Sequence, residues 1–295
     1  MSGEFDFISW IRAQQARSGL VQLPAGDDLA VLRWNANDLL LVGVDQVLDG
    51  VHFDSRIHTP RQIGKKVMNR NLSDCAAMAC LPGAAVATVA LPKGMDLNYA
   101  KELYLGLKEA ADGFDCPLVG GDTGSWNNPL TLTVTILGKS AGITPVTRSG
   151  AKSGDILYVT GKLGGSILGR HMTFTPQIHL ARELAMNFPI TSMLDISDGL
   201  SRDLRHICQQ SHVGAIVDAG HVPIHDDATA LSHRDGVSPL DHALHDGEDH
   251  ELLFTSPSTE VPAIRIGRII ESADIQLQTI DGLIPLAPKG WEHKL

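Results

Sequence analysis

The stretch Leu130-Thr131-Leu132-Thr133-Val134-Thr135-Ile136 alternates apolar and polar side chains without interruption. Successive side chains of a β-strand point to opposite faces of a sheet, so this stretch predicts a strand with one apolar face and one threonine face. Helices cover only the apolar face of such a sheet, and we therefore expect them on one side.

The preceding residues supply the other strands of this sheet and its helices. The predicted elements are strands at 29–34 and 39–44 joined as a hairpin, a helix at 60–78, a strand at 84–91 and a helix capped by Asp96. The order strand, strand, helix, strand, helix, strand indicates an α+β fold. Glycine, proline and serine are then frequent at 141–154, which predicts a boundary.

The second half begins a new series of elements. Short apolar runs predict strands at 155–160, 215–217 and 252–254. Ser197 or Asp198 is placed to cap a helix beginning near Leu200, whose apolar residues recur with helical spacing.

Composition narrows the class of protein. The chain has 295 residues, 43% of them hydrophobic, which is enough for one large or two ordinary domains with a core. A net charge of −10 argues against a nucleic-acid partner. No apolar run is long enough to span a membrane, and residues 1–6 lack the features of a signal peptide. The four cysteines form no Cys-x-x-Cys pair, so we expect buried, reduced thiols in a cytoplasmic protein.

Aspartates recur where apolar stretches end at a turn. They lie in Gly26-Asp27-Asp28, Val44-Asp45, Asn71-Leu72-Ser73-Asp74, Gly120-Gly121-Asp122-Thr123 and Asp195-Ile196-Ser197-Asp198-Gly199. Two carboxylates about 4 Å apart repel by roughly 4 kcal/mol at an effective dielectric constant of about 20. The sequence offers no matching basic cluster beside them, so together they predict divalent cations, with Mg²⁺ favoured by the oxygen ligands. Each alone is more simply interpreted as a cap or turn residue.

Two further segments each allow two interpretations. Gly161-Lys162-Leu163-Gly164-Gly165-Ser166 lacks the residue order of a phosphate loop, and it could present amides to phosphate or form a simple turn between strand and helix. His242 and His245 could share a helix face and bind zinc, although a solvated acidic turn ended by Gly247 is the favoured interpretation.

Three single residues are candidates for ligand contacts. Glu248 follows this acidic turn, and His52 follows a predicted metal aspartate. Arg148 could clamp a phosphate, because a guanidinium matches phosphate geometry, or it could be a surface arginine.

Together these segments resemble the thiamine-monophosphate kinase family, of the superfamily that includes aminoimidazole ribonucleotide synthetase, selenophosphate synthetase and the hydrogenase maturation protein HypE. Besides the aspartate segments, the matching residues are Gly3-Glu4-Phe5, Asp49-Gly50-Val51-His52-Phe53, Thr147-Arg148-Ser149-Gly150-Ala151-Lys152, Gly247-Glu248-Asp249 and Lys289-Gly290-Trp291. The resemblance extends over nearly the whole chain.

The resemblance implies ATP-dependent phosphorylation of thiamine monophosphate to thiamine diphosphate, by direct in-line transfer with several Mg²⁺ ions. It also implies two domains, an N-terminal domain at residues 1–142 and a C-terminal α/β domain at residues 143–295. The N-terminal domain is expected to pair with its copy in a homodimer. The resemblance assigns Mg²⁺ binding to Asp28, Asp45, Asp74, Asp122, Asp195 and Asp198. It assigns ATP binding to Gly121, Asp122, Arg148 and Ser197, and substrate binding to His52, Glu248 and Trp291.

The chain departs from the family pattern in a few places. His250 stands where the family usually has tyrosine, and Gly124-Ser125-Trp126-Asn127 replaces a segment that usually contains arginine. The alternatives are another ATP-using member of the superfamily with a different acceptor, or a non-catalytic nucleotide-binding relative. Selenophosphate synthetase needs a reactive residue near the N-terminus, whereas the first cysteine is Cys75, and HypE needs a C-terminal cysteine, which this chain lacks.

Overall fold

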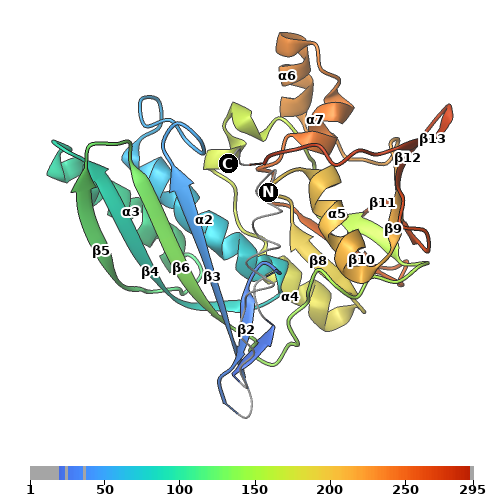
Figure 1. The fold of residues 1–295 in the computed structure, drawn as a ribbon, viewed down its shortest axis with the longest axis horizontal. Coiled ribbons are helices and arrows are strands. Elements are labelled where there is room, and N and C mark those ends of the chain that lie inside the picture. Colours follow the sequence, from blue (N-terminus) through green and yellow to red (C-terminus); the bar gives the residue numbers. More distant parts are fainter. Residues whose placement is uncertain (1–19, 24–25, 36–37, 293–295) are drawn as a thin grey trace, which may run out of the picture.

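Two β-sheets lie side by side in the computed structural model, which describes residues 20–23, 26–35 and 38–292 (Figure 1). The first sheet has the order β1 (Val21–Leu23), β2 (Ala30–Arg33), β3 (Leu39–Leu48), β6 (Thr131–Lys139), β4 (Leu81–Pro92) and β5 (Leu118–Trp126). The second has the order β13 (Gly282–Pro285), β12 (Ile275–Thr279), β9 (Gly214–Asp218), β11 (Ile264–Ile270), β7 (Ile156–Val159), β10 (Leu252–Ser256) and β8 (Ser192–Asp195). The predicted motif at residues 3–5 lies outside the described residues.

The first sheet confirms the predicted arrangement of helices on one side. Leu132, Val134 and Ile136 of β6 are buried, and the threonines between them face the other way. Helices α2 (Pro60–Ala77) and α3 (Leu97–Asp112) cover the apolar face (Figure 1). Asp96 caps α3 by accepting a hydrogen bond from the Asn98 amide, as predicted.

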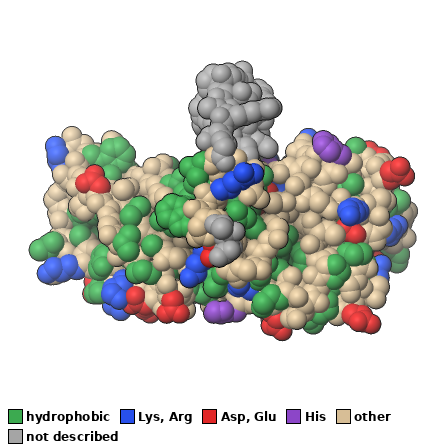
Figure 2. All heavy atoms as spheres, turned by 90° about the horizontal axis from the view of Figure 1, so that it is seen from below, with side chains coloured by type: hydrophobic (Ala, Val, Ile, Leu, Met, Phe, Trp, Pro, Cys, Tyr) green, Lys and Arg blue, Asp and Glu red, His purple; other side chains and the backbone are tan. Residues whose placement is uncertain are grey.

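The uncovered face of this sheet carries apolar side chains at the surface. Val44, Val86 and Trp126 are among its exposed residues, with 61%, 37% and 39% of their surface accessible. Figure 2, a view from below, shows hydrophobic side chains at several places over this half of the molecule. An exposed apolar sheet face is typical of a surface that associates with another protein.

The second sheet is mixed. Its one parallel pair among the described strands is β9 with β12, and its other pairs are antiparallel. Its helices are α4 (Ile178–Asn187), α5 (Leu200–Ser211), α6 (Asp226–Asp235) and α7 (Pro239–His245), with short 3-10 helices at Ser166–Leu168 and Arg170–Met172. All four cysteines are buried and free, as predicted. Among the described residues, no helix combines the length and apolar character needed to cross a membrane.

Helix α2 joins the two halves of the molecule. It contacts β3 and β6 on one side and α4 and β8 on the other. A capping box between Thr59 and Gln62 and the proline at its first turn fix where it begins. One buried apolar cluster contains residues of α2 together with Tyr158 of β7 and Ile178 of α4, so the core is continuous across the predicted domain boundary.

Two glycines bring α2 and α3 into backbone contact. A Cβ atom at Gly64 would lie 2.1 Å from the Leu103 carbonyl oxygen, and one at Gly106 would lie 2.1 Å from the Arg61 carbonyl oxygen. Neither position has space for a methyl group, so the packing of α2 depends on both glycines.

We therefore expect Gly106→Ala to lower the free energy of unfolding by about 1–3 kcal/mol, because the added methyl group forces the helices apart. Gly220→Ala is the control, since a Cβ atom there makes only an ordinary contact, 3.5 Å from Asp218 Oδ1. Chemical denaturation followed by circular dichroism measures both. Equal stabilities of the two variants would contradict the proposed contact.

Candidate active site

A cleft with a volume of about 1260 Å³ is lined by side chains from both halves of the chain. Every predicted site residue lines it except Gly121 and Asp122: Asp28, Asp45, His52, Asp74, Arg148, Asp195, Ser197, Asp198, Glu248 and Trp291. Residues more than 200 positions apart in the sequence therefore face the same space.

Three aspartates meet at one side of this cleft. Asp28 precedes β2, Asp74 lies in the last turn of α2, and Asp195 ends β8. Each contributes a carboxylate oxygen, and these oxygens all lie within 4.8 Å of one another. The Ser73 hydroxyl donates a hydrogen bond of 2.6 Å to Asp195 and so ties α2 to β8.

Three of the predicted metal-binding aspartates, Asp28, Asp45 and Asp195, have basic partners, which corrects the expectation that the chain offers none. Arg148 binds Asp28 through two nitrogens at 2.8 and 3.2 Å, and Arg70 Nε lies 3.2 Å from Asp45. Burial nevertheless raises the pKa of Asp28 to about 7, although Arg148 acts in the opposite direction. The partners come from distant segments, so their proximity could not be inferred from neighbouring residues.

Asp74 differs from these three aspartates. It forms no ion pair with any residue that the structure describes, although it is partly buried beside other acids. Burial, followed by the charges of Asp45, Asp195 and Asp28, raises its pKa well above the usual range. A cation would remove this cost, and carboxylate oxygens are ligands that Mg²⁺ and Mn²⁺ prefer. The donor set of Asp28, Asp74 and Asp195 therefore fits a divalent ion.

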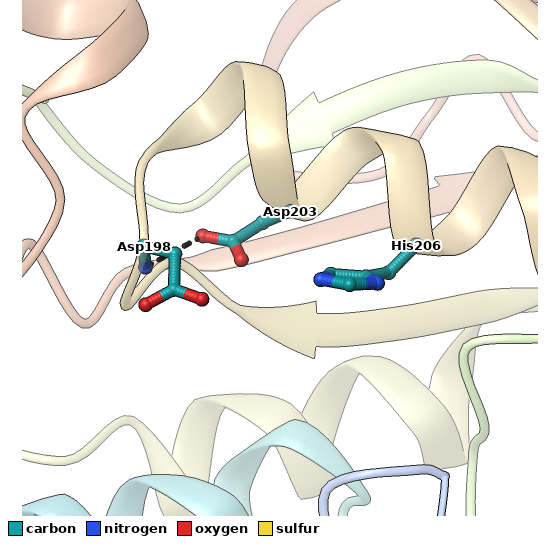
Figure 3. Close-up of side chains that lie close together, drawn as sticks. All are labelled: Asp198, Asp203 and His206. Atoms are coloured by element: carbon teal, nitrogen blue, oxygen red, sulfur yellow. Dashed lines mark hydrogen bonds between the residues drawn. The ribbon is translucent and has the colours of Figure 1, made fainter. Parts of the chain in front are cut away.

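A second group lies at the start of α5. Asp198, Asp203 and His206 each offer an atom within 4.8 Å of the others, and Figure 3 shows Asp198 in the loop before α5 and the other two side chains along the helix. Asp203 accepts hydrogen bonds of 3.1 Å from the amides of Asp198 and Gly199. The prediction that Ser197 or Asp198 caps α5 is wrong, because the N-cap residue is Gly199, which has no side chain to accept a hydrogen bond.

Asp122 does not join the other aspartates within one chain. Sequence analysis missed strand β5, which carries Asp122. Asp122 is in register with Thr88 of β4, which is in register with Thr133 of β6, which in turn is in register with Gln46 of β3. Residues in register share a face, so Asp122 points to the threonine face, whereas Asp45 points to the helix face. Three strand spacings also separate β5 from β3 by about 14 Å.

Gly121 lies beside Asp122 in this edge strand and also lies away from the cleft. A Cβ atom at Gly121 would come within 1.8 Å of the Ala87 carbonyl oxygen. The close approach of β4 therefore gives a structural reason for glycine at this position, independent of any nucleotide.

The predicted substrate residues lie together at another part of the cleft. The rings of His52 and Trp291 are 6.5 Å apart and tilted, and the Trp291 amide donates to the Asp198 carbonyl oxygen. Glu248 has a positive φ of 55° and its amide donates to Ser197. Backbone contacts with the loop after β8 thus position both Trp291 and Glu248.

Sequence analysis missed two basic residues of the site, Lys66 and Arg70, and noted His250 only as a departure from the family pattern. Lys66 and Arg70 of α2 contact Glu248, and His250 Nδ1 lies 3.2 Å from Asp195. Lys66, Arg70 and Asp74 are spaced at i, i+4 and i+8, which places them on one face of a helix. That spacing was the available signal.

The phosphate-loop interpretation of residues 161–166 does not hold. The Gly164 amide donates to both carboxylate oxygens of Asp249 at 3.0 Å, and the Gly165 amide donates to Asp246 at 2.9 Å. These amides are already bound to carboxylates of the same chain.

The zinc interpretation also fails, because the two histidines have separate partners. His242 contacts Asp246 and Asp235, whereas His245 contacts Ser201. Helix α7 ends at His245 with Asp246 as its C-cap, just before Gly247, in keeping with the prediction that Gly247 ends the helix.

Comparisons with known proteins agree with this geometry. Residues 26–140 match the N-terminal domain, and residues 149–279 the C-terminal domain, of the family described as AIR synthase related protein. The thiamine-monophosphate kinase of Rhodopirellula baltica is 37% identical over 284 residues, which cover 90% of this chain and 89% of that protein. The enzyme of that name from Aquifex aeolicus is 30% identical over 99% of this chain and 98% of its own.

A solved structure of AaThiL complexed with AMPPCP and TMP has a TM-score of 0.87 and 29% identity to this chain, and covers 99% of this chain and 97% of that one. The domain matches, the sequence relatives and the solved structure all point to the same family. The chain therefore belongs to the thiamine-monophosphate kinase family.

Proposed function

We propose that this protein transfers the terminal phosphoryl group of ATP to the phosphate of thiamine monophosphate, giving thiamine diphosphate and ADP. The observation that carries the proposal is the meeting of Asp28, Asp74 and Asp195 in the cleft that also holds the predicted heterocycle residues His52 and Trp291. Relatives that align with this chain over most or all of its length are thiamine-monophosphate kinases.

The acceptor in this reaction is a phosphate, which is already nucleophilic, so the site needs no strong base. The difficulty is to bring two anions together. Asp28, Asp74 and Asp195, with Asp45 and Asp198 nearby, would hold Mg²⁺ ions, which neutralise phosphate charge and align the reacting groups. Arg148 would contact ATP, and Trp291 offers a flat face for the heterocycle. Transfer is direct, without a covalent enzyme intermediate.

A homodimer forms part of the proposal and gives Asp122 a role. The uncovered face of the first sheet exposes Val44, Val86 and Trp126, and Asp122 lies on the same face. A second copy packed on this face would bury these side chains and bring Gly121 and Asp122 to the partner's cleft, where they would complete the ATP site. We also propose the domain division at 142/143 and a cytoplasmic location, in keeping with the free thiols.

The proposed function is tested by incubating the purified protein with ATP and Mg²⁺, with and without thiamine monophosphate. We expect ADP and thiamine diphosphate to appear together, and only when the acceptor is present. ADP release without the acceptor would favour a relative with a different acceptor. ATP binding without any turnover would favour the non-catalytic alternative.

Asp74→Asn should abolish turnover and raise the unfolding temperature of the metal-free protein, because it removes a partly buried charge that forms no ion pair with a described residue. Folded Asp74 has a raised pKa, so its ionisation destabilises the wild type as the pH rises above about 4. Mg²⁺ should stabilise the wild type but not the variant. Differential scanning calorimetry at pH 5 and pH 8, with Asp112→Asn as an exposed control, measures this effect. Equal stabilisation of both proteins by Mg²⁺ would contradict the assignment.

If Asp122 acts in the partner's site, mixed dimers should recover activity. Asp74→Asn and Asp122→Asn homodimers are each expected to be inactive. A dimer containing one chain of each retains one intact site, so random mixing should restore about a quarter of wild-type turnover. The mixture is prepared by co-expression with two affinity tags. A purified mixed dimer without activity would show that Asp122 serves its own chain.

A further inference from the structure

Arg70 links the metal side of the cleft to the substrate side. Its Nε atom lies 3.2 Å from Asp45 Oδ2, and its Nη1 atom lies 2.9 Å from Glu248 Oε1. Asp45 belongs to the acidic group, since its charge acts directly on Asp74. Glu248 belongs to the predicted heterocycle site. A phosphate that connects a bound heterocycle to the metal ions must therefore pass close to this guanidinium.

Glu248 already has another cation. Lys66, one helical turn before Arg70 and with 0% of its side chain exposed, places Nζ 2.6 Å from the second carboxylate oxygen of Glu248. Because Lys66 already neutralises Glu248, charge balance at Glu248 does not by itself explain an arginine at position 70. Arg70 can therefore bind another anion.

The Arg70 guanidinium has N–H groups that make no hydrogen bond to a described residue. Only Nε and Nη1 make hydrogen bonds to described residues, so Nη2 makes none within that part of the chain. The Arg70 side chain lines the cleft and is 16% exposed. A planar guanidinium with free N–H groups can bind phosphate through two parallel hydrogen bonds, which an ammonium cannot do.

Binding of Mg²⁺ by Asp45 would compete with Arg70 for the same carboxylate. The carboxylate oxygen that ligates a cation loses much of its attraction for the guanidinium, which then has a second nitrogen available. Two of the four arginines that line the cleft thus lie beside different anions, with Arg148 beside Asp28 and Arg70 beside Glu248.

We propose that Arg70 binds the phosphate of the acceptor, thiamine monophosphate, and holds it beside the metal ions for attack on ATP. This assignment rests on the proposed function. It makes Arg70 a specificity residue, because it distinguishes a phosphorylated acceptor from thiamine itself.

The test compares the binding of thiamine monophosphate with that of thiamine by isothermal titration calorimetry, with Mg²⁺ and a non-hydrolysable ATP analogue present. Arg70→Gln should weaken thiamine monophosphate binding about 10- to 100-fold, as expected for loss of charged hydrogen bonds. Thiamine lacks the phosphate, so Arg70→Gln should not weaken thiamine binding to the same extent. Arg70→Lys, which keeps the charge but not the paired hydrogen bonds, should give an intermediate loss.

Arg61→Gln is the matched control, because Arg61 lies on the same helix but is 47% exposed and pairs with Glu102 and Glu109 at the surface. It should leave the ratio of the two affinities unchanged. An unchanged ratio in Arg70→Gln would overturn the assignment, whether both affinities fall equally or neither falls. Failure of the proposed function would appear separately, as a wild type that forms no thiamine diphosphate.

Discussion

Repulsion between the carboxylates that meet at the end of α2 is the constraint on which the rest of this structure depends. Asp28, Asp74 and Asp195 come from three separate segments and lie within reach of one another. Such a group persists only if other forces hold those segments in place, because the charges themselves push them apart. The continuous apolar core around α2 supplies that force, and Arg148 and Arg70 offset part of the charge. The negative charge that these arginines do not offset is available to attract cations.

Much of the fold could be predicted because its elements carry local patterns. The alternation at 130–136 and the cap at Asp96 each depend on neighbouring residues, and both predictions are confirmed. Strand β5 was missed because its glycines and polar residues give no apolar alternation; pairing with β4, rather than its own composition, makes it a strand.

The site was predictable in its acids but not in their partners. Aspartates at chain turns have a recognisable pattern, whereas the pairing of Arg148 with Asp28 spans 120 positions and leaves no local trace. The same limit applies to the face on which a residue lies. Asp45 and Asp122 look equivalent in sequence, yet strand register sends them to opposite sides of one sheet.

The C-terminal segment is attached to the loop that carries Asp198. The Trp291 amide and the Lys289 carbonyl both bond to this region, and a side chain at Gly290 would collide with the Asp198 carbonyl oxygen. A displacement of the C-terminal segment would therefore also displace the loop that carries Asp198. For protein production, this argues for affinity handles and fluorescent fusions at the opposite terminus, and for caution with carboxypeptidase trimming.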